Sequence, residues 1–200
     1  MKKILITQDI IYAKSYLEKR DSISHLLLEF LQKNNYHPIL VPNNLMIFKK
    51  LINNIKFEGV ILSGGNDLGS EKNRDFIEKK LISYSIKKNI PILGICRGMQ
   101  IIAKFHGLKL HKTSNHANKK HYVTKSSNNK LSKLFNKTKV NSFHNFYIKK
   151  TNKKFENLLL APDNSIESFK IKNKDIFGVM WHPERMNSKK SNILIKKIFK

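Results

Sequence analysis

The single cysteine of the chain lies in a segment whose residue types suit nucleophilic catalysis. In residues 91–100, Cys96 follows an apolar run and has Gly94 and Gly98 two positions away on either side. This pattern predicts a strand, a tight turn with the cysteine at its tip, and a helix, because glycine lets the backbone pack closely around a strained nucleophile. The helix dipole would favour a thiolate there. The alternative is a buried structural cysteine at a strand-to-helix junction.

A histidine and a glutamate stand together near the other end of the chain. His182, Pro183 and Glu184 follow an apolar run that ends at Trp181. His182 has the chemistry of a base that takes the thiol proton and returns it to a leaving amine, and Glu184 is expected to accept the other imidazole N–H. We expect Pro183 to fix the turn so that both side chains leave the strand end together. A solvated turn is the alternative, but with Cys96 upstream the run predicts a catalytic triad.

Strands and helices are predicted to alternate around these two segments. Strand-like runs lie at residues 2–8, 37–41, 58–62, 89–95, 140–148, 157–161, 165–171 and 176–181. Apolar spacing predicts helices at residues 22–34, with Ser22 or Asp21 as cap, and at 45–55, 74–88, 99–105 and 191–199. The polar residues 109–139 are expected to form short strands and an exposed loop. The alternation implies one α/β domain over residues 1–200, with a mainly parallel sheet covered on both faces and an added antiparallel portion.

These motifs resemble the class I (triad) glutamine amidotransferase superfamily over about the whole chain. Residues 94–100, Gly-Ile-Cys-Arg-Gly-Met-Gln, and residues 181–184, Trp-His-Pro-Glu, stand in the order and with the spacing of that family. The resemblance implies a flavodoxin-like fold, a three-layer sandwich. It also implies that Cys96 is the nucleophile, His182 the base and Glu184 the residue that orients the base.

The same resemblance assigns binding residues. The loop at residues 63–65 supplies one oxyanion-hole amide in the family, which we place on Gly65, and Arg97 after the nucleophile supplies the other. Gln100 is expected to lie against the glutamyl portion of the substrate. The segment whose backbone holds the α-amino and α-carboxylate groups is expected at Ser142, Phe143 and His144. Without the resemblance, these segments read as a plain Gly-Gly turn and a half-buried strand.

Finer details favour γ-glutamyl hydrolases over amidotransferases coupled to a synthase. Arg74-Asp75 with Glu78, and residues 140–144, resemble the γ-glutamyl-γ-aminobutyrate hydrolase group, although residues 105–107 replace its usual Gly-Gly pair. Chain length, Lys/Asn-rich character and motifs resemble the branch that hydrolyses γ-glutamyl-CDP-amidate in capsular phosphoramidate synthesis, which implies release of glutamate and cytidine diphosphoramidate.

Three alternatives remain open at the level of the sequence. They are a γ-glutamyl-γ-aminobutyrate-type hydrolase, a glutaminase subunit that passes ammonia to a partner synthase, and a non-catalytic flavodoxin-like domain that binds anions or nucleic acid. An intact triad argues against the last of these. Because one amidase domain uses the whole chain, no obligatory protein partner is expected.

The charge of the chain is strongly basic, with 39 Lys and Arg against 14 Asp and Glu, a net charge of +25. The excess is nearly all lysine and is scattered along the chain, as in AT-rich codon usage, so we expect no nucleic-acid partner. The charge suits a small anionic γ-glutamyl substrate.

The numbers and spacing of cysteine and histidine indicate in which compartment the protein works and whether it needs a metal. One cysteine excludes an intramolecular disulfide and fits a reducing compartment. No signal-peptide pattern stands at the start, and no apolar run approaches the roughly 20 residues of a membrane helix. We therefore expect a cytoplasmic protein without membrane contact. The eight histidines show no ligand spacing with carboxylates or a second thiol, so no metal and no cofactor are expected.

Overall fold

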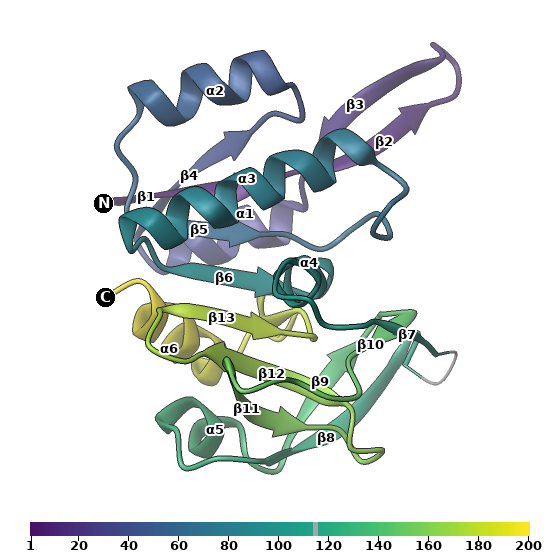
Figure 1. The fold of residues 1–200 in the computed structure, drawn as a ribbon, viewed down its shortest axis with the longest axis vertical. Helices are drawn as coiled ribbons and strands as arrows, with labels where there is room; N and C mark the ends of the chain where they lie inside the picture. Colours follow the sequence, from purple (N-terminus) through teal and green to yellow (C-terminus); the bar gives the residue numbers. More distant parts are fainter. Residues whose placement is uncertain (114–115) are drawn as a thin grey trace.

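One large sheet organises the computed structural model, which describes residues 1–113 and 116–200 (Figure 1). In this part of the chain, nine strands pair in the order β4-β1-β5-β6-β13-β12-β11-β8-β9. In that order the strands span Tyr36–Val41, Lys2–Thr7, Gly59–Leu62, Ile92–Ile95, Ile176–Val179, Ile166–Ile171, Phe155–Leu160, Lys119–Lys125 and Thr138–Ser142. Strands β4, β1, β5, β6 and β13 run parallel, and the other four extend the sheet antiparallel. The predicted α/β architecture is confirmed.

Two apolar cores lie on opposite faces of this sheet. Because successive strand side chains point to opposite faces, Ile4 and Ile6 enter one core and Leu5 enters the other. The first core is closed by α1 (His25–Lys33), α5 (Lys130–Phe135) and α6 (Lys189–Ile198), and the second by α2 (Leu45–Asn54), α3 (Lys72–Lys88) and α4 (Arg97–Phe105). The sheet therefore forms the middle layer of three. Among the described residues, no helix is long and apolar enough to cross a bilayer.

Two parts of the fold differ from the sequence-based expectation. Strands β2 (Asp9–Ala13) and β3 (Glu18–Ser22) form a projecting hairpin that periodicity did not predict (Figure 1). Because its second strand reaches Ser22, the first helix has Ser24 as its N-cap, and the prediction of Ser22 or Asp21 is wrong. Asp21 instead accepts two hydrogen bonds from Asn43, at 2.9 and 2.7 Å.

The polar segment 109–139 contains more structure than predicted. It includes helix α5, which begins where the Asn129 side chain accepts a hydrogen bond from the backbone N–H of Leu131. It also includes β7 (His111–Lys112), which pairs with β10 (Phe146–Tyr147). Residues 114–115 of the predicted loop lie outside the described residues.

Candidate active site

Cys96 occupies the sharp turn between β6 and α4. Its backbone has φ 51° and ψ −106°, a conformation that costs a non-glycine residue about 1–3 kcal/mol and is found where the surroundings enforce it. Its N–H donates a 2.8 Å hydrogen bond to the carbonyl oxygen of Val179. A β-carbon on Gly98 would lie 1.9 Å from the carbonyl oxygen of Leu62, so only glycine fits there. The predicted strand, turn and helix are present with the cysteine at the tip.

Burial decides the protonation of this thiol. The Cys96 side chain is buried, and burial raises its pKa to about 12, although a hydrogen bond from the backbone N–H of Arg97 acts in the opposite direction. The nearby carboxylates of Glu184 and Glu167 raise the pKa further. Burial thus favours the neutral thiol, whereas the helix dipole favours the thiolate, and attack by a neutral thiol requires a base.

His182 and Glu184 leave the end of β13 together, as predicted. The 3₁₀ turn η1 (Pro183–Arg185) follows His182. This turn places Glu184 Oε1 2.7 Å from the Nδ1 atom of His182. Because the carboxylate accepts a hydrogen bond from Nδ1–H, the proton of the neutral ring stays on Nδ1 and Nε2 is free to act as a base. Asn141 fixes the backbone of the histidine, since its side chain bonds both the N–H and the carbonyl oxygen of His182 at 2.9 Å.

Gly64 marks the point where the histidine and the cysteine meet. A β-carbon on Gly64 would lie 3.4 Å from His182 Nε2 and 3.7 Å from Cys96 Cβ. A cavity of about 260 Å³ opens beside them, lined by Gly64, Gly65, His182, Glu184 and Arg185 among others. Residues 63–65 and 182–185, distant in sequence, thus line one open space, and Cys96 lies against Gly64 beside it.

The two predicted oxyanion donors, Gly65 and Arg97, directly follow Gly64 and Cys96. The backbone N–H of Arg97 acts on the Cys96 thiol and lowers its pKa. Gly65 follows Gly64 with φ 115°, and a β-carbon there would lie 2.4 Å from Asp9 Cγ. The conformation and the close approach both require glycine at this position.

A buried ionic network supports this loop, and the sequence analysis used Arg74 and Glu78 only as marks of resemblance, without a structural role. The fully buried Arg74 guanidinium donates to the carbonyl oxygens of Ser63, at 3.1 Å, and Gly64, at 2.6 Å, and pairs with Asp9 at 2.8 Å. Burial lowers the pKa of Arg74, and pairing with Glu78 at 3.2 Å raises it. The spacing of Arg74 and Glu78, four residues apart on one predicted helix, was the available signal.

The side chain of Arg97 extends the same network. It forms short ion pairs with Glu78 and Asp75 of α3. Glu78 therefore bridges the two arginines, one of which holds the Ser63–Gly64 carbonyls while the other carries the amide beside the thiol.

The predicted glutamyl-binding residues divide into two groups. Phe143 is partly exposed, and its ring lies 6.1 Å from the His182 ring and 5.1 Å from the Arg185 guanidinium. The side chains of Ser142 and His144 are buried instead, since neighbours in an extended segment alternate. Gln100 is also buried, with Nε2 3.4 Å from the carbonyl oxygen of Phe146.

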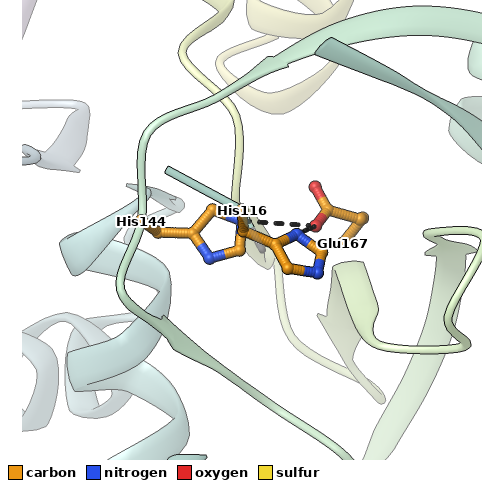
Figure 2. Close-up of side chains that lie close together, drawn as sticks. All are labelled: His116, His144 and Glu167. Carbon is orange, nitrogen blue, oxygen red and sulfur yellow. Dashed lines mark ion pairs between the residues drawn. The ribbon is translucent and has the colours of Figure 1, made fainter. Parts of the chain in front are cut away.

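His144 belongs to a cluster that sequence spacing did not reveal. Ligand-type atoms of His116, His144 and Glu167 all lie within 4.8 Å of one another, so these three residues could hold a metal ion (Figure 2). Burial alone would raise the pKa of Glu167, but its contacts with His121 and His144 lower the pKa, so the group is a carboxylate. The spacing of histidines along the sequence did not reveal this cluster, because the fold brings together residues that are far apart in the chain.

Comparison with known proteins places this fold and site in one class. Residues 16–200 match the family model described as Glutamine amidotransferase class-I, and the chain belongs to this family. It is therefore a γ-glutamyl amide hydrolase of the cysteine-triad type.

Individual relatives refine the comparison. The chain is 38% identical to a gamma-glutamyl-CDP-amidate hydrolase of Campylobacter jejuni, covering 97% of this chain and 96% of that protein. It is 31% identical to the glutamine-hydrolyzing GMP synthase subunit of Methanococcus maripaludis, over 80% and 82% of the two chains. The crystal structure of a glutamine amidotransferase from Thermotoga maritima matches with a TM-score of 0.69 at 19% identity, over 98% of this chain and 86% of that one, which shows the common flavodoxin-like fold.

Proposed function

We propose that the chain hydrolyses γ-glutamyl-CDP-amidate and releases glutamate and cytidine diphosphoramidate for modification of a capsular polysaccharide. The observation that carries this proposal is the 38% identity with the hydrolase of that name, which extends over nearly the full length of both proteins. The similarity to the GMP synthase subunit is lower and covers less of the chain. It makes a glutaminase subunit the second candidate, whereas a γ-glutamyl-γ-aminobutyrate-type hydrolase rests on resemblance alone.

The proposed reaction begins with the neutral thiol. His182 Nε2 removes the proton of Cys96 while the sulfur attacks the γ-carbonyl carbon, and Glu184 stabilises the resulting imidazolium. The backbone amides of Gly65 and Arg97 hold the oxyanion, each contributing about 3 kcal/mol to the transition state in sites of this kind.

The reaction is then completed in two stages, the breakdown of the tetrahedral intermediate and the hydrolysis of the thioester. His182 gives its proton to the leaving nitrogen, the C–N bond breaks, and a γ-glutamyl thioester remains on Cys96. A water molecule that loses its proton to His182 attacks the thioester, which frees glutamate and restores the thiol. None of these steps calls for a cofactor.

The substrate is proposed to bind in two halves. Gln100 and the backbone of residues 142–144 hold the glutamyl half, beside the exposed Phe143 ring. The leaving half is anionic, and the net charge of +25 favours its approach. Each Lys or His⁺ contact with the diphosphate would contribute about 1.5–3 kcal/mol as a charge-assisted hydrogen bond, and two such contacts amount to about a hundredfold or more in kcat/KM.

Steady-state kinetics with the isolated chain test the substrate. Glutamate release is measured from γ-glutamyl-CDP-amidate, glutamine and γ-glutamyl-γ-aminobutyrate, at low and raised salt. We expect kcat/KM to favour the nucleotide compound by about a hundredfold, with an advantage that shrinks as salt screens the phosphates. Equal turnover of glutamine would refute this substrate while leaving γ-glutamyl hydrolysis intact.

The same assay tests whether the chain needs a partner protein. We propose that the chain acts alone on a small molecule, without nucleic acid or membrane, in the reducing cytoplasm that its single cysteine suits. If glutamate appears only after a synthase is added, the chain is a glutaminase subunit instead.

A further inference from the structure

A group of buried polar side chains lies behind the segment of residues 142–144. His116 precedes β8, His144 follows β9 and Glu167 lies on β12, and they are 5%, 2% and 1% exposed (Figure 2). Within residues 1–113 and 116–200, His116 Nδ1, His144 Nε2 and both Glu167 carboxylate oxygens have no hydrogen-bond partner. Buried polar atoms almost always have one, so this group requires an explanation.

The opposite ring nitrogens determine which atoms carry protons. His144 Nδ1 lies 2.9 Å from the carbonyl oxygen of Phe146, which only accepts, so Nδ1 is the protonated nitrogen. His116 Nε2 lies 2.9 Å from Asp163 Oδ2, a carboxylate that also accepts. In the neutral rings, His116 Nδ1 and His144 Nε2 therefore present lone pairs.

Both lone pairs face the same carboxylate oxygen. Glu167 Oε1 lies 3.9 Å from His116 Nδ1 and 3.5 Å from His144 Nε2. Two lone pairs and a carboxylate oxygen repel one another in a buried site unless a positive charge lies between them. That charge is either a proton on an imidazole or a bound cation.

The distances favour a cation. A charge-assisted N–H···O bond to a carboxylate is about 2.7–2.9 Å long, which is shorter than either separation here. Tetrahedral Zn²⁺ with bonds of about 2.0–2.2 Å holds its ligand atoms roughly 3.3 Å apart. The separations of 3.5 and 3.9 Å from Glu167 Oε1 are close to this value, and all three ligand atoms lie within 4.8 Å of one another, so the cluster would contract around a bound cation.

The surroundings also resemble the outer layer of a metal site. A metal-binding histidine usually donates its other N–H to a carboxylate or a backbone carbonyl, as His116 does to Asp163 and His144 to Phe146. His121 Nε2, another buried atom without a hydrogen-bond partner among the described residues, lies 3.5 Å from the second carboxylate oxygen, Glu167 Oε2.

We propose that His116 Nδ1, His144 Nε2 and Glu167 Oε1 bind one divalent transition-metal cation of the zinc class, with a water molecule or small anion as fourth ligand. The role is structural. Ser142 Oγ donates a 2.6 Å hydrogen bond to the carbonyl oxygen of His116, and the neighbouring Asn141 holds the His182 backbone. A cation would thus tie the 142–144 segment to β12 beside the triad, whichever γ-glutamyl compound the enzyme cleaves.

Zinc titration of metal-free protein tests the site directly. All variants carry Cys96→Ala, because a thiol beside His182 would bind Zn²⁺ itself. Protein stripped with a chelator is titrated with Zn²⁺ against a chromophoric competitor, and thermal unfolding is followed with and without Zn²⁺. We expect one Zn²⁺ per chain and a rise in Tm, because the cation binds only the folded state.

Three further substitutions test whether Zn²⁺ binds at this cluster. Asp163→Asn, at a half-exposed side chain that does not threaten the core, should weaken Zn²⁺ affinity about 10–100-fold through the orientation of His116. Glu167→Gln should weaken it more and abolish the rise in Tm, with circular dichroism to check the fold. His37→Ala, at an exposed histidine on β4, should change neither.

Two results would overturn the proposal. One is that the Cys96→Ala protein takes up no Zn²⁺ at tens of micromolar free metal. The other is that Asp163→Asn and Glu167→Gln bind Zn²⁺ as tightly as the parent and His37→Ala, which would place the metal elsewhere. Either result would leave protons as the charge between the imidazoles and Glu167.

Discussion

Arg74 Nη2 donates a 2.6 Å hydrogen bond to the carbonyl oxygen of Gly64 from a guanidinium that is fully buried. Gly64 lies against both His182 and Cys96, so this bond connects the ionic network of α3 to the reacting atoms. Breaking one partner of a buried ion pair leaves an uncompensated charge, which explains why the network holds its geometry. The network positions the amides that we assign to the oxyanion hole without touching substrate.

Arg74→Lys is expected to lower kcat while KM changes little. Lysine keeps the charge, but its single ammonium cannot reach Asp9, Glu78 and the two loop carbonyls together. A loop displacement of about 1 Å costs on the order of a hundredfold in rate. The measurement is glutamate release, with Arg20→Lys on the exposed hairpin as control. An unchanged kcat in Arg74→Lys would show that the loop keeps its place without the network.

Cys96→Ala and Cys96→Ser should abolish turnover and leave the fold intact. The cysteine lies at a strained turn beside His182, where its loss removes the attacking atom but little volume. The expected loss in kcat is on the order of 10⁵–10⁶-fold, as for other nucleophiles of triads. Activity is measured as glutamate release and folding by circular dichroism. Retention of more than a few per cent of wild-type activity would exclude Cys96 as the nucleophile.

His182→Ala should be nearly as damaging as loss of the cysteine, and Glu184→Ala clearly less so. The histidine moves protons in both stages, whereas the glutamate, 2.7 Å from Nδ1, orients it. We expect a loss on the order of 10⁶-fold for the first and 10⁴-fold for the second in kcat. Glu18→Ala, in the exposed hairpin, is the matched control. Equal and mild losses at residues 182 and 184 would point to a structural turn.

Stability should fall at alkaline pH because of the buried thiol. Burial raises the pKa of Cys96 to about 12, whereas an unfolded cysteine ionises near about 8.5. Below both values the thiol is neutral in both states. Between them only the unfolded chain gains the thiolate, so stability is lost as pH rises through this window.

Urea unfolding of wild type and Cys96→Ala at pH 8 and pH 10 measures this effect. The wild-type protein should lose up to about 1.4 kcal/mol more per pH unit than the variant. The thiolate absorbance near 240 nm should be absent from the folded protein at pH 8. A thiolate signal at neutral pH would instead indicate a resting ion pair with His182.

The sequence by itself was sufficient for the local geometry of the site. Gly94 and Gly98, each two positions from Cys96, predicted a strained turn, because glycine lets the backbone within a few residues pack closely around the nucleophile. His182 and Glu184 are two positions apart, so one short turn determines their contact. The parallel sheet was predicted from apolar strand-like runs that alternate with segments of helical apolar spacing, because each pattern shows which residues of its own segment are buried.

Only the tertiary structure decided which distant residues meet. The order and register of nine strands, within the described residues, bring His144 and Glu167 within 3.5 Å of each other. The packing of α3 beneath the Ser63–Gly64 loop likewise joins Arg74 to the carbonyl oxygen of Gly64. Such contacts leave no periodic trace in the chain, because they arise from strand pairing and helix packing between segments far apart in sequence.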